Sequence, residues 1–486
     1  MSSQIVHHFR TRHRRAPGGA NRPRRPWSLL VLLSLAQFMV VLDVTVVNVA
    51  LPSIGADLRL APGDLQWVVT AYVLFTGGLL LLGGRLADVL ERRSLFVAGL
   101  AIFTTSSLAS GLAFSAGALI VARAAQGVGA ALLTPAALAI ITATYTGTQR
   151  STALAAWGAV ASAGAAVGML LGGMLTTWLS WEWVFLINVP IGVGVAAAAF
   201  HLVDRSPPTP SERRRLDLPG AALALAGLVT FVYALDGTSE HGWGSVRTLG
   251  LLGGAAGLLA AFALVERRVA HPLIAPSTWR ARHLTAGAGL MLGATALLVG
   301  TFYLNTLYLQ AVLGASALET GLAFLPIALA IGAAAHAVGH LVGLLGTRRV
   351  VLAGLVLITA AAALLAAAPA HAGYWTDLLP GFVALGLGVG LVLPAANVTA
   401  MSQVDDTRAG LAAGLMSTAH EIGAALGVAL LSAIAAATGP LEGAELAAGY
   451  QDGFVVAAAI AAAMAGAAAV VVPTVRPATG VRIALH

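Results

Sequence analysis

The chain has 486 residues, of which 58% are hydrophobic and 10% are charged. A soluble domain carries about 25% charged residues, so this composition indicates an integral membrane protein and excludes a soluble enzyme, a nucleic-acid-binding domain and a disordered protein. All 27 basic residues are arginine, and the formal net charge is +7. There is no cysteine, which excludes disulfides, thiolate catalysis and cysteine-bound metals.

Apolar stretches between charged or Pro/Gly-rich breaks predict fourteen membrane spans, since a spanning helix needs about 20 mostly apolar residues. Loops as short as 114–118 and 178–183 make consecutive spans antiparallel helices. Long runs such as Ala458–Val472 do not alternate, which excludes a β-barrel. The sequence therefore predicts an all-α polytopic membrane protein with spans near 28–54, 66–83, 94–114, 118–142, 153–178, 183–203, 217–235, 247–265, 284–311, 320–342, 350–368, 375–401, 409–437 and 453–473.

The arginines orient these spans. If the N-terminus is cytoplasmic, 24 of the 27 arginines fall on the cytoplasmic side, as the positive-inside rule requires. Arg59 and Arg247 fall outside, and Arg123 lies within a span. We expect the basic tail 1–26 to be a cytoplasmic anchor near anionic lipid headgroups, because the apolar run behind it is too long for a signal peptide. Residues 474–486 form a second cytoplasmic tail.

A weak internal repeat divides the chain into two halves. Gly84–Arg93 follows the second span and is echoed by Gly339–Arg349 after the tenth. The echo predicts six-helix bundles at 27–203 and 284–473, with linkers and an inserted helix pair at 204–283. Repeats around a central site are typical of secondary transporters. The chain has no GxxxxGK[ST] loop, which argues against an ATP-driven pump.

Four stretches make the chain resemble the major facilitator superfamily, within its fourteen-span drug:proton antiporter family. They are Leu42–Pro52, Gly84–Arg93, Arg123–Ala130 and Trp181–Gly192. The resemblance implies two six-helix bundles plus an inserted hairpin, and transport rather than enzymatic activity. It also implies a proton gradient as the energy source with no cofactor, no nucleic-acid partner, and a multi-pass location in a bacterial inner or plasma membrane. A monomer is favoured.

Charged side chains inside predicted spans are costly to place and are therefore candidates for function. Asp43 lies roughly 10 Å and Arg123 roughly 8 Å from the outer boundary at 1.5 Å per residue, so the two share a depth. We hypothesise that Asp43 carries the proton and that Arg123 tunes its affinity, because burial favours a neutral carboxyl whereas a nearby guanidinium favours the ionised form. The alternative is a static ion pair that joins two helices.

Glu421 lies near the middle of the thirteenth span, where an unpaired carboxylate is expected to be protonated. Relatives often have an Arg-Gln pair where this chain has His420 and Glu421. We expect Glu421 to affect substrate charge preference or to be a second titrating site, and the alternative is a neutral acid that bridges helices. His336 and His340 are four residues apart but lack a third ligand, so we expect no metal site.

The resemblance assigns the loop after the second span to a conformational gate. Its clamp residues would be Gly84, Arg85, Asp88, Arg92 and Arg93. Val89, Glu91 and, in the second copy, Gly343 depart from the family pattern, and the alternative is a simple positive-inside turn.

The fifth span carries small residues that let helices approach closely. They are Gly164, Gly168, Gly172 and Gly173. This stretch resembles the antiporter motif, but Met169 replaces its proline, so we expect no proline kink there.

Polar and amphipathic side chains within spans are candidates for substrate binding, because aromatic and amide groups suit amphipathic molecules and an embedded carboxylate favours cations. The leading expectation is a proton-driven exporter of drugs, dyes or antibiotics. The alternatives are a dedicated exporter of one metabolite, siderophore or lipid-like molecule and, more remotely, a membrane sensor or scaffold. The candidate binding residues are Gln37, Gln126, Asn188, Tyr303, Asn305, Tyr308, Gln310, Asn397 and His420.

Overall fold

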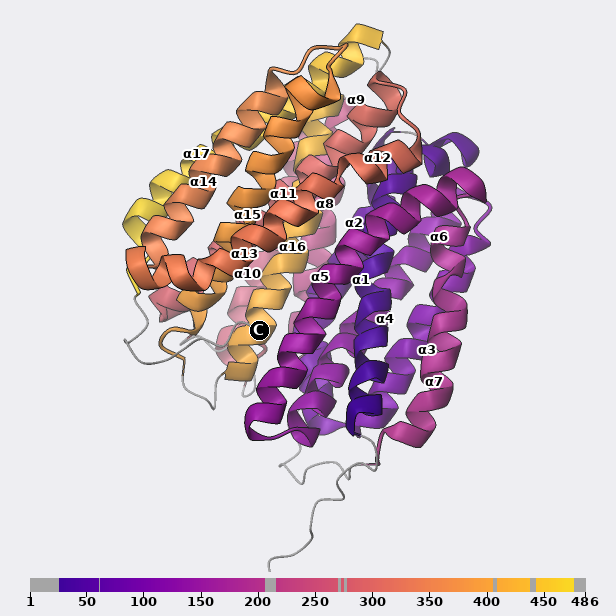
Figure 1. Cartoon of the computed structure of the whole chain (residues 1–486), viewed down its shortest axis with the longest axis vertical. Helices are drawn as coiled ribbons and strands as arrows, with labels where there is room; N and C mark the ends of the chain where they lie inside the picture. Colours follow the sequence, from indigo (N-terminus) through magenta and orange to yellow (C-terminus); the bar gives the residue numbers. More distant parts are fainter. Residues whose placement is uncertain are drawn as a thin grey trace, which may run out of the picture.

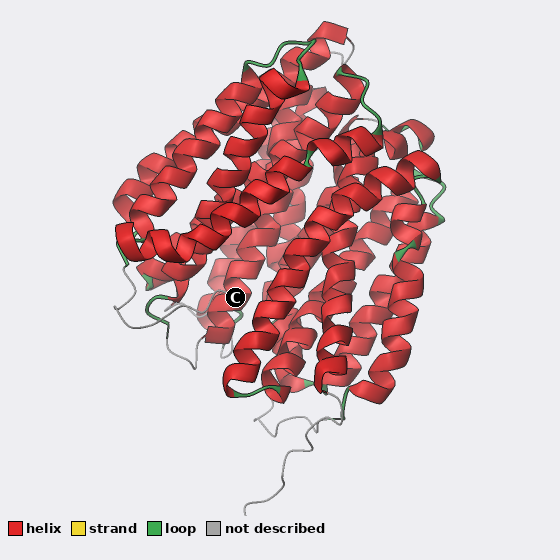
Figure 2. Cartoon of the chain, viewed as in Figure 1, coloured by secondary structure: helices red, strands yellow, loops and turns green. Residues whose placement is uncertain are grey.

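The computed structural model of the chain describes residues 26–60, 62–205, 216–269, 272–274, 278–404, 409–437 and 443–475. Throughout this part of the chain the regular elements are helices joined by short loops (Figure 2). Fourteen helical segments within it are long and apolar enough to cross a membrane, one at each predicted position. The all-α polytopic prediction is confirmed, and the chain is a multi-pass membrane protein. Most of both predicted tails, 1–25 and 476–486, lies outside the described residues.

In chain order the elements are α1 (Pro26–Asp57), α2 (Pro62–Val89), α3 (Arg92–Gly111), α4 (Ala116–Thr144), α5 (Gly147–Trp178), α6 (Trp183–Leu186), α7 (Asn188–Leu202), α8 (Leu218–Asp236), α9 (Thr238–His241), α10 (Val246–Arg268), the 3₁₀ turn η1 (Thr278–Arg280), α11 (Arg282–Leu307), the π-helical turn η2 (Tyr308–Val312), α12 (Ala317–Ala323), α13 (Leu325–Leu345), α14 (Thr347–Ala366), the π-helical turn η3 (Tyr374–Leu378), α15 (Leu379–Met401), α16 (Ala409–Ala436) and α17 (Gly443–Val471).

Several helices extend beyond the apolar stretches that predict them. The fifth spanning helix begins at Gly147, whereas its apolar stretch begins near residue 153. Backbone hydrogen bonding continues through the polar turn 147–152 once a helix is nucleated. Hydropathy alone therefore places the start of this helix too late in the chain. α5 runs without interruption through Met169, as expected where the motif proline is absent.

Each repeated segment covers the end of one helix, a short turn and the start of the next helix, so it is more helical than a loop. The first joins α2 to α3, and the second joins α13 to α14 through Gly346, whose φ of +81° suits glycine. Both turns lie at the end of the bundle where α1 begins. We call this the arginine-rich end and the opposite one the arginine-poor end.

The helices of residues 26–203 gather on one side of the molecule and those of residues 278–475 on the other (Figure 1). We call these groups the two halves. α8 and α10 form the inserted hairpin and pack against each other. α8 also packs against α2 and α16, so the hairpin touches both halves. At the α2 contact, a Cβ on Gly78 would lie 2.9 Å from Cδ1 of Leu225, so the two helices pack closely there.

The halves are joined at the arginine-poor end. Gln310 Nε2 donates to the Val49 carbonyl at 2.9 Å, and the Leu318 amide donates to Oγ1 of Thr177 at 3.2 Å. A Cβ on Gly173 of α5 would lie 2.7 Å from the Ala317 carbonyl oxygen of α12. From this contact α5 and α13 diverge toward the arginine-rich end (Figure 1), where Leu344 is 61% exposed. The halves are therefore bonded to each other at the arginine-poor end, whereas α5 and α13 separate toward the arginine-rich end.

Candidate functional site

Asp43 of α1 and Arg123 of α4 form a fully buried ion pair inside the first half. Arg123 Nη1 donates to Asp43 Oδ2 at 2.5 Å, and neither residue has exposed surface. The equal depth deduced from the sequence therefore corresponds to direct contact. Breaking a buried pair by removing one partner costs about 3–5 kcal/mol, because it leaves a charge without compensation.

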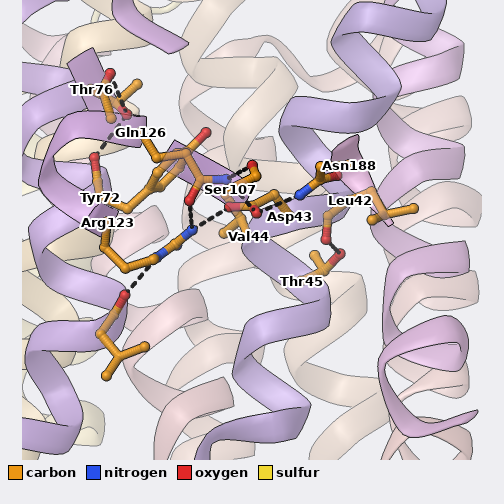
Figure 3. Close-up of polar contacts among 12 residues, drawn as sticks. Leu42, Asp43, Val44, Thr45, Tyr72, Thr76, Ser107, Arg123, Gln126 and Asn188 are labelled. Atoms are coloured by element: carbon orange, nitrogen blue, oxygen red, sulfur yellow. Dashed lines mark hydrogen bonds and ion pairs between the residues drawn. The ribbon is translucent and has the colours of Figure 1, made fainter. Parts of the chain in front are cut away.

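Two amides complete the shell around this carboxylate (Figure 3). Gln126 Nε2 donates to Asp43 Oδ1 at 2.7 Å, and Asn188 Nδ2 donates to the same oxygen at 2.8 Å. Gln126 also accepts from Arg123 Nη1 at 2.7 Å and donates to Ser107 Oγ at 2.7 Å. The network thus brings together α1, α3, α4 and the start of α7.

The guanidinium of Arg123 is held on its other sides as well. Its Nε donates to the Val68 carbonyl at 2.9 Å, and its Cζ lies 4.4 Å from the centroid of the Tyr72 ring and 5.5 Å from that of Phe185. Cation–π contacts of this kind stabilise a desolvated guanidinium. The arginine therefore has a fixed position against α2 as well as against Asp43.

Each of the three partners of the Asp43 carboxylate is a hydrogen-bond donor. An ionised carboxylate only accepts, whereas a protonated one must also donate. The site as seen here therefore fits the ionised form of Asp43, and a proton on this carboxyl requires one donor to withdraw or turn. Asn188 Oδ1 is buried and has no hydrogen-bond donor among the described residues, so the amide has an acceptor in reserve.

Glu421 of α16 lies where the second half meets α2. A Cβ on Gly77 would lie 2.7 Å from the Glu421 Cβ, so the two helices are in close contact there. Glu421 is half-buried, and its carboxyl has no hydrogen-bond or ion-pair partner among the described residues. The same helix α2 carries Tyr72, whose ring packs against Arg123. The adjacent His420 does have a hydrogen-bond partner, because its Nδ1 lies 3.0 Å from Thr295 Oγ1 of α11.

Most of the predicted substrate-binding side chains do not line a cavity in this conformation. Gln126 and Asn188 belong to the Asp43 network, and Gln310 is bonded across the halves. Buried groups without exposed surface cannot meet a substrate before the helices move. Gln37 is half-buried and Asn397 is exposed, so these two remain accessible. The candidate binding side chains that are at most 1% exposed are Gln126, Asn188, Tyr303, Asn305 and Tyr308.

Among the described residues, the side chains predicted to form the clamp make no ion pair. Gly84 has no neighbour within 4 Å of where a Cβ would lie, and Asp88 is exposed without an ion pair to a described residue. Arg93 instead stacks on Phe200, with 5.1 Å from its Cζ to the ring centroid, and Arg85 donates to the Pro272 carbonyl at 3.0 Å. Arg92 is half-buried, and its guanidinium has no hydrogen-bond acceptor among the described residues.

The glycines of α5 contact two different partners. Gly164, Gly168 and Gly172 face α1, where added Cβ atoms would lie 3.3 Å from Phe38 Cδ2, in collision with Thr45 Oγ1, and 2.8 Å from the Val46 carbonyl oxygen. Gly173 instead faces α12 of the other half. Small residues therefore permit close packing both within one half and across the closed end.

His336 and His340 are both exposed on α13. Across the described ranges, no group of three His, Asp or Glu side chains is placed to hold a metal ion.

Sequence reasoning missed Ser107 and Tyr72. Both are neutral, so a search for charges in spans passes over them. Ser107 ends the polar run Thr104–Ser107 in an otherwise apolar span, and this run was the available signal.

Comparisons with known proteins agree with this architecture. Residues 33–312 and 290–484 match the family described as Major Facilitator Superfamily. The chain is 42% identical over 409 residues to a puromycin resistance protein of Streptomyces alboniger, covering 83% of the chain and 80% of the relative. It is 41% identical over 411 residues to a cephamycin export protein of Amycolatopsis lactamdurans, covering 84% and 85%. A crystal structure of a bacterial homologue of the human lysosomal transporter Spinster shares its fold, with a TM-score of 0.67, 17% identity, and coverage of 95% and 100%.

Proposed function

The chain belongs to the Major Facilitator Superfamily, and we propose that it exports amphipathic small molecules such as drugs, dyes or antibiotics in exchange for protons, by alternating access. It is a membrane transporter rather than an enzyme. The observation that carries proton exchange is the buried Asp43–Arg123 pair, whose surrounding donors favour one protonation state of the carboxyl. Relatives named for resistance to puromycin and for export of cephamycin support outward transport of antibiotics.

The arginine-rich end is assigned to the cytoplasm of a bacterial plasma membrane, with both termini on that side, because the positive-inside rule favours this orientation. We assign the conformation described here, in which α5 and α13 separate toward the cytoplasmic end and three donors surround Asp43, to the state in which an exporter receives its substrate. Protonation from the outside neutralises Asp43 and loosens its hold on Arg123. Release of that proton to the cytoplasm restores the pair and returns the transporter to the loading state.

The energetics are sufficient for concentrative export. One proton gains about 2.3 kcal/mol from 100 mV of membrane potential and about 1.4 kcal/mol from one pH unit. Together these sustain a gradient of several hundred-fold for a neutral substrate. A substrate cation would meet Glu421, the partner-free carboxyl between the halves, which is the chemistry that favours positively charged amphipathic molecules.

A second candidate function is dedicated export of one compound. The names of several relatives each specify one antibiotic, among them puromycin, cephamycin and lincomycin, which favours a narrow substrate range. Substrate breadth separates the two candidates, because a panel of unrelated lipophilic cations would be carried only by a multidrug exporter.

The decisive experiment uses inside-out vesicles with an imposed proton gradient and a panel of fluorescent lipophilic cations. We expect gradient-driven uptake by the wild type and its loss in Asp43→Asn, which keeps the shape of the side chain but cannot carry the proton. Glu421→Gln is the matched variant and should retain proton coupling while losing affinity for cations. Equal uptake by wild type and Asp43→Asn would contradict the assignment of Asp43. Uptake of none of the dyes would leave the dedicated exporter as the function.

A further inference from the structure

A short segment that follows the inserted hairpin in the chain, residues 272–274, contacts the end of α2, and we call it the strap. Arg85 Nη2, at the end of α2, donates to the Pro272 carbonyl of the strap at 3.0 Å. The next two strap residues, Leu273 and Ile274, are 4% and 7% exposed and belong to the main hydrophobic core. The strap is therefore a packed part of the molecule, and its carbonyl is a fixed acceptor for the gate arginine.

Glu266, near the end of α10, fixes the backbone of the strap. Its Oε1 accepts from the Leu273 amide at 3.2 Å and its Oε2 from the Ile274 amide at 2.9 Å, with the side chain 4% exposed. Both oxygens of one buried carboxyl thus hold two successive amides, which turns the preceding Pro272 carbonyl toward α2. Proline has no backbone N–H donor, so the Pro272 carbonyl is the polar backbone group that this residue offers to Arg85.

Asp217 joins the start of the hairpin to the same point. Its Oδ1 accepts from the Gly220 amide at 2.8 Å and caps α8, while its carboxyl faces that of Glu266. Asp217 is 3% exposed, and its Oδ2 has no hydrogen-bond donor among the described residues. The neighbouring cations Arg267 and Arg268 of α10 are exposed. Because two buried carboxylates that face each other repel, a neutral side chain is tolerated at this position.

We propose that Glu266 is a positioning residue for the gate: it holds the strap so that the Pro272 carbonyl receives Arg85 while the arginine-rich end is open. The inference rests on the proposed alternating access, in which Arg85 must leave this acceptor when that end closes. Without the strap, the guanidinium would have no partner among the described residues in the open state. The inserted hairpin thereby stabilises the open state, in addition to packing against both halves.

The test measures the two conformations directly. The wild-type chain has no cysteine, so spin labels can be placed at Ser151→Cys of α5 and Leu344→Cys of α13, two exposed positions at the arginine-rich end of different halves. We expect a long-distance population from the open state. Glu266→Ala should lower the ratio of long to short distances roughly tenfold, the effect of losing one hydrogen bond to a charged group. Arg85→Ala should lower it equally.

The double variant Glu266→Ala/Arg85→Ala distinguishes positioning from a general structural role. Since Glu266 acts through Arg85, the double variant should match Arg85→Ala alone. Glu240→Ala is the matched control, an exposed glutamate in α9 at the other end of the same hairpin, and should leave the ratio unchanged.

An unchanged ratio in folded Glu266→Ala, or an equal further drop when Arg85 is already absent, would overturn the proposal. If Glu266→Ala does not fold, Glu266→Gln carries the test. It retains one acceptor oxygen and is neutral beside Asp217, so a smaller reduction is expected that again disappears in the Arg85→Ala background. No substrate or gradient enters the measurement, so failure of the proposed export would not be mistaken for failure of this inference.

Discussion

At the residue scale, Asn188 is the amide best placed to respond to the proton on Asp43. Its Nδ2 donates to Asp43 Oδ1 at 2.8 Å, whereas its Oδ1 is buried without a hydrogen bond. A neutral Asp43 carboxyl needs an acceptor for its new hydrogen. Rotation of the Asn188 amide by half a turn would bring its oxygen into that position, so one side chain can satisfy both protonation states.

We therefore predict that Asn188→Leu lowers gradient-driven uptake about tenfold or more, since a hydrogen bond to a charged group contributes about 1.5–3 kcal/mol. Uptake by inside-out vesicles measures the effect. Asn305→Leu is the matched control, because Asn305 is equally buried, also has a free Oδ1, and bonds only its own helix at the Thr301 carbonyl. Similar losses in both variants would mean that burial of the amide, and not its position beside Asp43, is responsible.

At the scale of the helices, two neighbouring glycines of α5 separate stability from conformational preference. A Cβ on Gly172 would lie 2.8 Å from the Val46 carbonyl oxygen of the same half, and one on Gly173 would lie 2.7 Å from the Ala317 carbonyl oxygen of the other half. The first contact exists in every conformation in which the half stays rigid. The second exists only while the arginine-poor end is closed.

We predict that Gly172→Ala lowers the free energy of unfolding by about 1–3 kcal/mol, the usual cost of overpacking, with little change in the spin-label distances between Ser151→Cys and Leu344→Cys. Gly173→Ala should instead shift those distances toward the short population. Thermal unfolding and the distance measurement together check this. A shift caused by Gly172→Ala and not by Gly173→Ala would refute the division.

The sequence predicted the helices well because each needs only a long apolar run, and the depth of Asp43 and Arg123 followed from counting residues along two such runs. The partners of Asp43 could not be found in this way. Asn188 enters at the junction of α6 and α7, where the chain direction is set by packing. The rotation of each helix about its axis is likewise a tertiary property, which is why Tyr303, Asn305 and Tyr308 were expected at a cavity and are buried.

At the scale of the whole molecule, alternating access requires that the contacts closing the arginine-poor end break in every cycle. Thr177 and Leu318 mark this end, because the Leu318 amide donates to Thr177 Oγ1 at 3.2 Å across the halves. The absence of native cysteine means that Thr177→Cys/Leu318→Cys places its two thiols in an otherwise thiol-free protein. A disulfide between them would hold this end shut while leaving the arginine-rich end free.

We predict that oxidation of this pair abolishes uptake by inside-out vesicles and that a reductant restores it, because the substrate can enter from the arginine-rich end but cannot leave at the other. Substrate binding, measured by fluorescence quenching, should survive oxidation for the same reason. Each single-cysteine variant, treated identically, controls for damage by the oxidant. Full uptake with the cross-link quantitatively formed would exclude alternation between these two ends, and with it the conformational cycle on which the roles of Asp43 and Arg85 depend.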